Sequence, residues 1–224
     1  MAEVASAGYH LAFSDEFNAP ELDAAKWDYR TGSNFFSTQL PANVSVADGS
    51  LKIQLKKESA GNQAYTGGGV ISRSLFKYGY YEARIKVPAS SGWHTSFWTK
   101  SQHRIEGGKQ EIDICEQTSV KPDYSVGVID WNFPKGKSAG RLYPPAPDLH
   151  QNFHVWSCKF TPALVKFYFD GQPVYQIDAT TFAHSQQNIW LTAIANTKVD
   201  DSKLPAVAEF DYVRFYAPPD SAAK

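Results

Sequence analysis

The sequence predicts an all-β protein whose antiparallel strands form a sandwich or a barrel. Short alternating or aromatic-rich runs recur along the chain, separated by Gly, Pro, Asn and Asp. Two tripeptides, ADG at 47–49 and FDG at 169–171, stand between apolar runs, which is the short-range pattern of a β-hairpin. No long stretch shows the apolar period of a helix. Many short strands with turn residues between them favour antiparallel sheets.

The expected elements begin with one short helix and continue as strands. The segment ELDAAKW, 21–27, is the best candidate for the helix. In SLKIQLK, 50–56, Leu51, Ile53 and Leu55 alternate with polar residues, as in a strand with one face in a core. The runs expected to form strands are 43–58, 67–88, 93–100, 111–117, 124–133, 153–162, 164–176, 188–196 and 208–217.

The composition fits one folded domain. The 224 residues are 42% hydrophobic and 14% aromatic, which is enough for a sizeable core. No linker, repeat or charge block divides the chain, so we expect a single domain over 1–217 and a frayed tail over 218–224. The two cysteines, Cys115 and Cys158, lie in strand-like runs and are expected to be free thiols.

Charge and hydropathy argue against nucleic-acid and membrane partners. The formal net charge is -1, from 22 basic and 23 acidic residues, without the basic excess of nucleic-acid-binding proteins. No apolar run approaches the roughly 18 residues of a membrane span. The start, MAEVASAGYH, lacks the basic and apolar regions of a signal peptide, so the chain is either cytoplasmic or a mature form with an added Met.

One strand-like run, KQEIDICEQ at 109–117, carries three acids among core residues. Side chains alternate along a strand, so Glu111 and Asp113 point to one face and the isoleucines beside them point to the core. Simple alternation would bury Glu116 with the isoleucines, which is costly for an unpaired carboxylate. One extra residue, a β-bulge at Ile114–Cys115, returns Glu116 to the acidic face. The sequence therefore predicts a bulge between the second and third acids.

Two glutamates that face one cleft across an aspartate are the groups that retaining glycoside hydrolysis needs. One carboxylate attacks the anomeric carbon, and the other protonates the leaving oxygen and then activates water, with the two carboxyl groups roughly 5–5.5 Å apart. Crowded like charges raise the pKa of one carboxyl, which would keep the acid protonated. The alternatives are an exposed strand with three solvated acids, or a cation site.

The acidic run resembles glycoside hydrolase family 16, whose members carry E-x-D-x-E or the bulged E-x-D-x-x-E. Glu111-Ile-Asp113-Ile-Cys-Glu116 matches the bulged form, which is typical of laminarinase-like and agarase-like members. The resemblance continues through FSDEFN, LPANVSVADGSL, FKYGYYEARIKVP, SGWHTSFW, FHVWSCKFTP, VKFYFDG and EFDYVRFY, in that order along the chain.

The resemblance implies a concanavalin-A-like jelly roll, a β-sandwich of two curved antiparallel sheets with an open cleft on the concave face. It also implies that Glu111 is the nucleophile and Glu116 the general acid/base, while Asp113 hydrogen-bonds the nucleophile and tunes its charge. The implied activity is endo-acting, retaining hydrolysis of a β-linked polysaccharide, with no cofactor for catalysis.

Aromatic residues are the expected sugar platforms, because the apolar face of a pyranose stacks on a ring. The candidates are Trp93, Trp98 and Trp131, which flank the acidic run. The odd separation of Trp93 and Trp98 puts them on opposite faces of a regular strand, so one of them is expected in the cleft. Trp156 and Trp190 are assigned to the core. Two polar candidates for substrate contact are His94, which could equally be structural, and Arg104.

The loop before the acidic run bears on the substrate. Laminarin-cleaving members usually carry a Trp shortly before the nucleophile, where this chain has Gly107, Gly108, Lys109 and Gln110. The loop KSQHRIEGGKQ, 100–110, instead has a basic excess, which suits an anionic or sulfated galactan but also an ordinary solvated loop. Both a β-1,3-glucan such as laminarin and a red-algal galactan stay open as substrates.

Two rival functions use the same scaffold. A lectin-like carbohydrate-binding domain would hold sugar without cutting it, although the presence of all three acids argues against it. A transglycosylase would pass the covalent intermediate to a sugar acceptor in place of water. For the hydrolase we expect a monomer that is secreted or periplasmic and whose signal peptide has been removed.

Many members of the family hold a structural calcium ion on the convex side. Glu16, the backbone of Gly49 and Asp211 match the positions of its ligands in the resemblance, and calcium takes such oxygen ligands. Asp211 could equally cap a turn.

Overall fold

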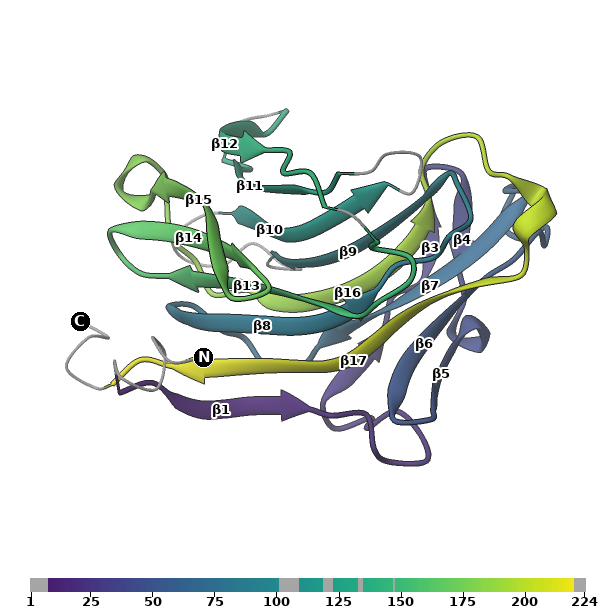
Figure 1. Cartoon of the computed structure of the whole chain (residues 1–224), viewed down its shortest axis with the longest axis horizontal. Coiled ribbons are helices and arrows are strands. Elements are labelled where there is room, and N and C mark those ends of the chain that lie inside the picture. The colour runs from purple at the N-terminus through teal and green to yellow at the C-terminus, as the bar shows by residue number, and fades with distance from the viewer. Residues whose placement is uncertain (1–7, 101–108, 119–122, 133–134, 147, 220–224) are drawn as a thin grey trace.

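Two β-sheets packed face to face form the body of the protein (Figure 1). The computed structural model describes residues 8–100, 109–118, 123–132, 135–146 and 148–219. One sheet has eight strands: β15 (Gln172–Asp178), β14 (Leu164–Phe169), β13 (His154–Phe160), β8 (Gly79–Lys86), β17 (Ala206–Ala217), β6 (Ser50–Leu55) and β5 (Val44–Ala47) in spatial order, with β1 (His10–Asp15) paired to β17. The all-β sandwich predicted from the alternating runs is confirmed.

The second sheet has nine strands and carries the acidic run near one edge. Its spatial order is β12 (Lys137–Leu142), β11 (Ser125–Asp130), β10 (Gln110–Thr118), β9 (Trp93–Lys100), β16 (Asn188–Ala195), β7 (Tyr65–Ser72), β4 (Ser37–Gln39) and β3 (Gly32–Asn34), with β2 (Trp27–Tyr29) paired to β7. The strands are curved in Figure 1. Within the described residues the strand pairs of both sheets are antiparallel except for the parallel pair β4–β7, so the expectation of purely antiparallel sheets needs this one correction.

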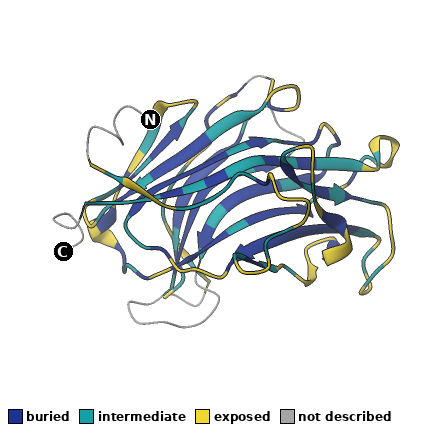
Figure 2. Cartoon of the chain, turned by 90° about the horizontal axis from the view of Figure 1, so that it is seen from below, coloured by how far each residue is buried: buried dark blue, intermediate teal, exposed yellow. Residues whose placement is uncertain are grey.

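The core lies between the two sheets. Ile53, Ala83 and Phe210 from the eight-stranded sheet and Phe97 and Leu191 from the nine-stranded sheet are all 0% exposed. Buried residues follow the middle of the strands, and exposed residues gather at the turns (Figure 2). Burial of these side chains, each worth about 1.5–3 kcal/mol, fixes which face of each strand looks outward.

Both predicted hairpins are confirmed. Asp48 and Gly49 connect β5 to β6, and Asp170 and Gly171 connect β14 to β15. All four residues have positive φ angles, from 48° to 77°, as the two-residue turns that match the strand twist require.

The predicted helix at 21–27 is wrong. Trp27 begins strand β2, and Ala24–Lys26 form a single turn. Asp23 organises that turn, because its side chain accepts from the Ala25 N–H at 2.8 Å and its carbonyl accepts from the Lys26 and Trp27 N–H groups. A side chain that caps its own backbone favours a turn over a helix, and Trp27 is then drawn into the core.

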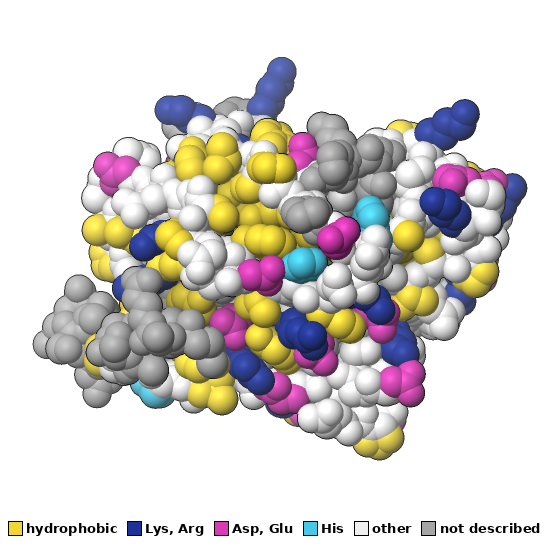
Figure 3. Space-filling view, in the orientation of Figure 1, with side chains coloured by type: hydrophobic (Ala, Val, Ile, Leu, Met, Phe, Trp, Pro, Cys, Tyr) yellow, Lys and Arg dark blue, Asp and Glu magenta, His cyan; other side chains and the backbone are white. Residues whose placement is uncertain are grey.

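Three 3₁₀ turns complete the secondary structure of the described residues: η1 (Pro41–Asn43), η2 (Ala179–Thr181) and η3 (Asp201–Lys203). Cys115 and Cys158 are buried free thiols, as predicted. The described residues contain no helix with the length and apolarity of a membrane span. On the face seen in Figure 3, acidic and basic side chains are interspersed. The single domain over 1–217 stays a prediction, and residues 220–224 of the predicted tail lie outside the described residues.

Candidate active site

The predicted bulge lies in the middle of β10. Against β9, Asp113 pairs with Trp98 and Cys115 with Phe97, so Ile114 is the extra residue. Against β11, the same irregularity separates the pairs Asp113–Gly127 and Glu116–Ser125. Ile114 and Cys115 both enter the core, at 1% and 0% exposed. The bulge at Ile114–Cys115 is confirmed, and it places Glu116 on the same outer face as Glu111.

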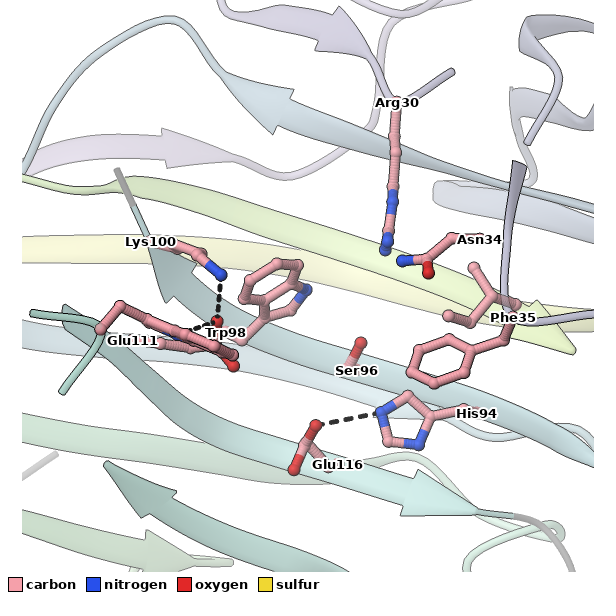
Figure 4. A pocket seen from close by; sticks show the side chains of 11 residues that line it. Arg30, Asn34, Phe35, His94, Ser96, Trp98, Lys100, Glu111 and Glu116 are labelled. Atoms are coloured by element: carbon pink, nitrogen blue, oxygen red, sulfur yellow. Dashed lines mark hydrogen bonds and ion pairs between the residues drawn. The ribbon is translucent and has the colours of Figure 1, made fainter. Parts of the chain in front are cut away.

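Glu111 is held by two donors. The Trp131 indole N–H donates to Glu111 Oε2 at 2.9 Å, and the Lys100 ammonium lies 2.9 Å from the same oxygen. Lys100 also sits 4.1 Å from the centre of the Trp131 ring, a cation–π contact that keeps both donors together. One carboxylate oxygen of Glu111 is thereby fixed (Figure 4).

Arg141 joins the other two acids. This residue on the edge strand β12 forms ion pairs with Asp113 Oδ2 and Glu116 Oε2. The Ser125 hydroxyl donates to Glu116 Oε2 at 3.1 Å, and Arg141 donates to Ser125 at 2.9 Å. On the other side of Glu116, Nε2 of His94 lies 3.1 Å from Oε1.

The pKa values of Asp113 and Glu116 differ from the expectation. Burial raises the pKa of Asp113 well above its ordinary value, assisted by the charges of Glu116 and Glu111 and opposed by Arg141. Burial is also the largest single influence on Glu116, but the hydrogen bond and charge of His94 and the charge of Arg141 together outweigh it and lower the pKa of Glu116 to about 2. One crowded carboxyl does have a raised pKa, as predicted. That carboxyl is Asp113, so the expectation that crowding keeps the acid protonated is wrong for Glu116 in the unliganded protein.

A groove of ≈ 280 Å³ opens over Glu111 and Glu116 on the outer face of the nine-stranded sheet. Trp98 lies along it, with the Trp190 ring 4.7 Å away at 31°. The Arg30 guanidinium stands 5.8 Å and 5.7 Å from the centres of these two rings. Burial lowers the pKa of Arg30 to about 10, and the Glu111 charge opposes that shift. The lining residues are Arg30, Asn34, Phe35, His94, Ser96, Trp98, Lys100, Glu111, Glu116, Trp131 and Ile194, most of them labelled in Figure 4.

Three of the five candidate substrate contacts line this groove: Trp98, Trp131 and His94. Trp93 is wrong as a sugar platform, because its ring is 0% exposed and packs edge-on against Tyr65 in the core. Trp93 and Trp98 therefore lie on opposite faces, as their spacing predicts. Arg104 lies outside the described residues.

Of the two tryptophans assigned to the core, Trp156 is buried and Trp190 is not. Trp190 pairs with Trp98 across β16 and β9, so it shares the outer face and its ring is partly exposed. Its indole N–H donates to the Lys100 carbonyl at 3.1 Å. The core assignment of Trp190 is wrong because the register between these two strands cannot be read from either run alone.

Sequence reasoning missed three groove residues from a distant segment, Arg30, Asn34 and Phe35, and also Arg141, which contacts two of the acids. The pair Phe35–Phe36 in the polar stretch GSNFFS offered a signal, because both rings are more than half exposed, at 59% and 53%. Arg141 offered none, since the stretch 137–142 has no strand-like pattern in the sequence.

A second groove of ≈ 260 Å³ lies on the far side of Glu116. It shares Glu116 with the first groove but does not contain Glu111. Its lining is polar apart from two tyrosine rings, and consists of Glu116, Thr118, Asp123, Tyr124, Ser125, Tyr143, Asn196 and Thr197. Glu116 therefore stands between two grooves, while Glu111 opens onto only one.

The three candidate calcium ligands do not fit a calcium ion as they are arranged. Both oxygens of Glu16 bond to Arg214, at 2.9 Å and 2.7 Å, and Asp211 is paired with Arg84 at 2.6 Å. Within the described residues there is no group of three or more His, Cys, Asp or Glu side chains that could hold a metal. The positive charges beside Glu16 and Asp211 are therefore those of arginine side chains, where the prediction placed a calcium ion.

Comparison with known proteins gives the family. The sequence model of the beta-porphyranase A–D GH16 domain matches residues 10–217, nearly the whole chain. The chain belongs to glycoside hydrolase family 16. The family's members are glycoside hydrolases, and the resemblance seen in the sequence is confirmed.

Relatives within this family act on several polysaccharides. A β-glucanase of Acetivibrio thermocellus is 28% identical over 87% of this chain, a β-porphyranase D of Zobellia galactanivorans 34% over 64%, and a κ-carrageenase of Pseudoalteromonas carrageenovora 31% over 80%. The chain spans 60%, 34% and 53% of the lengths of these relatives.

Solved structures of the family share the jelly-roll fold. SCLam, a non-specific endo-β-1,3(4)-glucanase of family 16, superposes with a TM-score of 0.83 at 26% identity, covering 94% of this chain and 92% of that chain. LamAcat of Zobellia galactanivorans has a TM-score of 0.82 at 23% identity over 95% of this chain and 99% of that chain, which shows the common fold.

Proposed function

We propose that this protein is an endo-acting, retaining glycoside hydrolase that cleaves an anionic, β-linked galactan of the red-algal type. The observation that carries the proposal is the bulged strand β10, which presents Glu111 and Glu116 to one groove with Asp113 between them. The match to the beta-porphyranase sequence model supports the galactan.

Glu111 is the nucleophile in this proposal. Its Oε2 is occupied by Trp131 and Lys100, which leaves Oε1 for attack on the anomeric carbon. Both groups can only donate hydrogen bonds, so they fit an oxygen of the carboxylate that acts as a nucleophile. The bond from the sugar to Glu111 forms as the glycosidic bond breaks, and water later hydrolyses the resulting ester.

Glu116 is the general acid and then the general base. It reaches both grooves, which is the place of a group that protonates the oxygen between two sugars. The groove that contains Glu111 then holds the sugar that becomes covalently bound. The groove beyond Glu116 holds the leaving sugar, since it has no nucleophile.

Asp113 is a positioning residue that acts on its two neighbours. It is 1% exposed; Oδ2 is bonded to Arg141 and Oδ1 has no hydrogen-bond partner among the described residues, so the expected hydrogen bond to Glu111 is not formed there. Burial favours the neutral form of Asp113. A neutral Asp113 removes a like charge from between two glutamates that must carry different charges during the reaction.

The lining of the first groove supports an anionic sugar chain. Arg30 and Lys100 flank the Trp98 ring, so a sugar stacked on Trp98 would have a cation on each side. Stacking accounts for the sugar ring, and the guanidinium and ammonium groups account for a sulfate or carboxylate on it. The β-glucanase relatives keep laminarin as the second candidate substrate.

A product screen tests the proposal. The protein would be incubated with porphyran, agarose, κ-carrageenan, laminarin, lichenan and β-1,3-galactan, with the Glu111→Gln variant as the matched control. We expect reducing ends and a rapid fall in viscosity with porphyran, and neither with the variant. Release only from laminarin would move the substrate to the β-glucans. Binding without release from any of them would favour a carbohydrate-binding domain.

Product analysis with an added oligosaccharide acceptor separates hydrolysis from transglycosylation. We expect free reducing sugars as the main product and the newly formed anomer to keep the β configuration. We further propose that the protein acts outside the cytoplasm, because a polymeric substrate cannot enter the cell. We also propose that it acts as a monomer.

A further inference from the structure

Glu116 has a hydrogen-bonding neighbour on each oxygen, which sets a condition on its role as an acid. Oε1 lies 3.1 Å from Nε2 of His94, and Oε2 accepts from Ser125 and from Arg141. A protonated carboxyl must donate a hydrogen bond from one oxygen. One of these neighbours therefore has to be an acceptor when Glu116 carries its proton.

Arg141 cannot serve as that acceptor. A guanidinium has only N–H donors and is not deprotonated in proteins. Because Arg141 donates to Glu116 Oε2, a proton on that oxygen would be directed against the guanidinium N–H groups. Ser125 lies on the same oxygen, where it donates to Oε2 at 3.1 Å and accepts from Arg141 at 2.9 Å. Glu116 Oε2 is thereby kept as an acceptor, and the transferable proton belongs on Oε1.

His94 is the neighbour that can take either role. Its Nε2 donates to Oε1 when the imidazole is protonated and accepts from Oε1 when the imidazole is neutral. The other ring nitrogen lies 3.1 Å from Thr118 Oγ1, a hydroxyl that can also donate or accept. Histidine is the side chain best suited to exchange a proton between pH 5 and 8. The contact of 3.1 Å thus serves both protonation states without movement of the strands (Figure 4).

Of the charged side chains that the structure describes around this pair, Glu116 is the one that contacts His94. Around Glu116, β10 supplies Glu111 and Asp113 and β12 supplies Arg141. Elsewhere in the groove the charged residues are Arg30, which follows β2, and Lys100 on β9. The residues that β16 and the β3–β4 segment contribute to the groove lining, Ile194, Asn34 and Phe35, are neutral.

We propose that His94 is a positioning residue that acts through Glu116, storing the proton that the general acid delivers and taking it back afterwards. The proposal rests on the proposed function, which makes Glu116 the acid/base. It adds a residue to that role, at a contact in which Nε2 of His94 can either donate to Glu116 Oε1 or accept from it.

The proton that His94 gives up in the first step returns to it in the second. In the first step the proton on His94 Nε2 passes to Glu116 Oε1 and on to the glycosidic oxygen, while the C–O bond breaks and a bond from Glu111 to the anomeric carbon forms. In the second step water attacks that carbon, the ester to Glu111 breaks, and the proton of the water returns through Glu116 to His94. One glycosidic bond and one water become two hydroxyl groups.

The test compares His94→Gln with His150→Gln. The glutamine amide nitrogen can keep the hydrogen bond to Oε1 but cannot hand over a proton, and His150 is an exposed histidine in the turn after residue 147. The profile of kcat/KM against pH would be measured on porphyran. It would also be measured on a 2,4-dinitrophenyl glycoside of the released oligosaccharide, whose leaving group needs no proton.

The expected result separates proton transfer from structural damage. His94→Gln should lose on the order of 10²-fold in kcat/KM on porphyran at pH 7, with the basic limb moved to lower pH, and keep nearly all of it on the dinitrophenyl glycoside. His150→Gln should match the wild type. An unmoved basic limb, or equal losses on both substrates, would overturn the proposal.

A carboxyl NMR titration of ¹³C-glutamate-labelled protein gives a second readout that needs no substrate. The Glu116 resonance, assigned with Glu116→Gln, should show a higher midpoint in His94→Gln than in the wild type, where the pKa is lowered to about 2. An unchanged midpoint would overturn the link between the two residues. If the midpoint rises but the wild type cleaves none of the polysaccharides, the proposed function fails and the proton link stands.

Discussion

The two ends of β10 hold their glutamates in different ways, although both residues face the same groove. Glu111 contacts an indole N–H and an ammonium, two donors that keep a carboxylate ionised. Glu116 contacts a guanidinium that also binds Asp113, and a histidine that can gain or lose a proton. The Glu111 end therefore suits a carboxylate that keeps its charge, and the Glu116 end suits a carboxyl group whose charge alternates during the reaction.

The bulge makes this difference possible. Without the extra residue at Ile114, one glutamate would enter the core and the two ends could not face one substrate. With it, Glu111 is positioned by β9 and the residue after β11, while Glu116 is positioned by β9, β11 and β12. Each of the following predictions changes one end and asks whether the other is affected.

The largest expected effect is at the Glu111 end. Glu111→Gln should lower kcat by on the order of 10⁵-fold, because removal of a catalytic nucleophile leaves only binding and electrostatic terms. Steady-state kinetics on the hydrolysed polysaccharide measures this loss, and thermal unfolding checks that the fold is kept. Residual activity within tenfold of the parent would remove Glu111 from the mechanism.

The next largest effect is at the Glu116 end and depends on the leaving group. Glu116→Gln should lower kcat/KM on the polysaccharide by roughly 10²- to 10⁴-fold, the range for loss of a general acid. On a dinitrophenyl glycoside the loss should be much smaller, because that leaving group departs without a proton. Equal losses on both substrates would assign Glu116 a structural role.

Removal of the Arg141 guanidinium should show in stability and its pH dependence. Arg141→Met leaves the half-buried Glu116 without its cation and the buried Asp113 without a hydrogen-bond donor, and should cost about 2 kcal/mol at pH 7. Glu116 has a depressed folded pKa, about 2 against an ordinary value of about 4.3, so its stabilisation is complete above pH 4.3 and lost as the pH falls toward 2.

The measurement is urea unfolding of the wild type and of Arg141→Met between pH 7 and pH 2.5. The gap in unfolding free energy should narrow as the pH falls through this window. Lys135→Met, at an exposed cation just before the same strand, is the matched control and should leave the curve unchanged. A gap that stays constant with pH would show that Arg141 contributes packing alone.

The smallest stability effect is expected at Asp113. Because burial raises its folded pKa, the folded state favours the neutral form, and ionisation of Asp113 would cost stability as the pH rises. Asp113→Asn imitates the neutral acid and should change the unfolding free energy at pH 7 by less than about 1 kcal/mol. Urea unfolding measures this, and a loss as large as that of Arg141→Met would show that Asp113 is ionised in the fold.

Much of this site could be predicted from local sequence. Alternation put Glu111 and Asp113 on one face, and the misfit of Glu116 located the bulge. The two Asp-Gly turns need positive φ angles, so they gave both hairpins. The spacing of Trp93 and Trp98 gave opposite faces but not which of them was buried, because that depends on the sheet packed beneath.

The rest depended on contacts between distant segments. Arg141 reaches Glu116 from 25 positions away, along a strand whose sequence has no alternating pattern. Trp190 joins the groove only through the register of β16 against β9. The calcium prediction took no account of such contacts: Arg214 and Arg84, from elsewhere in the fold, pair with two of the three proposed ligands, Glu16 and Asp211.

Azide rescue is the sharpest test of whether the two ends of β10 have different roles. Glu111→Ala and Glu116→Ala would each be incubated with a dinitrophenyl β-glycoside and sodium azide, and the products identified by NMR. With Glu111 removed, azide should displace the leaving group directly and give the α-glycosyl azide. With Glu116 removed, azide should attack the covalent intermediate and give the β-glycosyl azide. The reverse pairing, or the same anomer from both variants, would contradict the account.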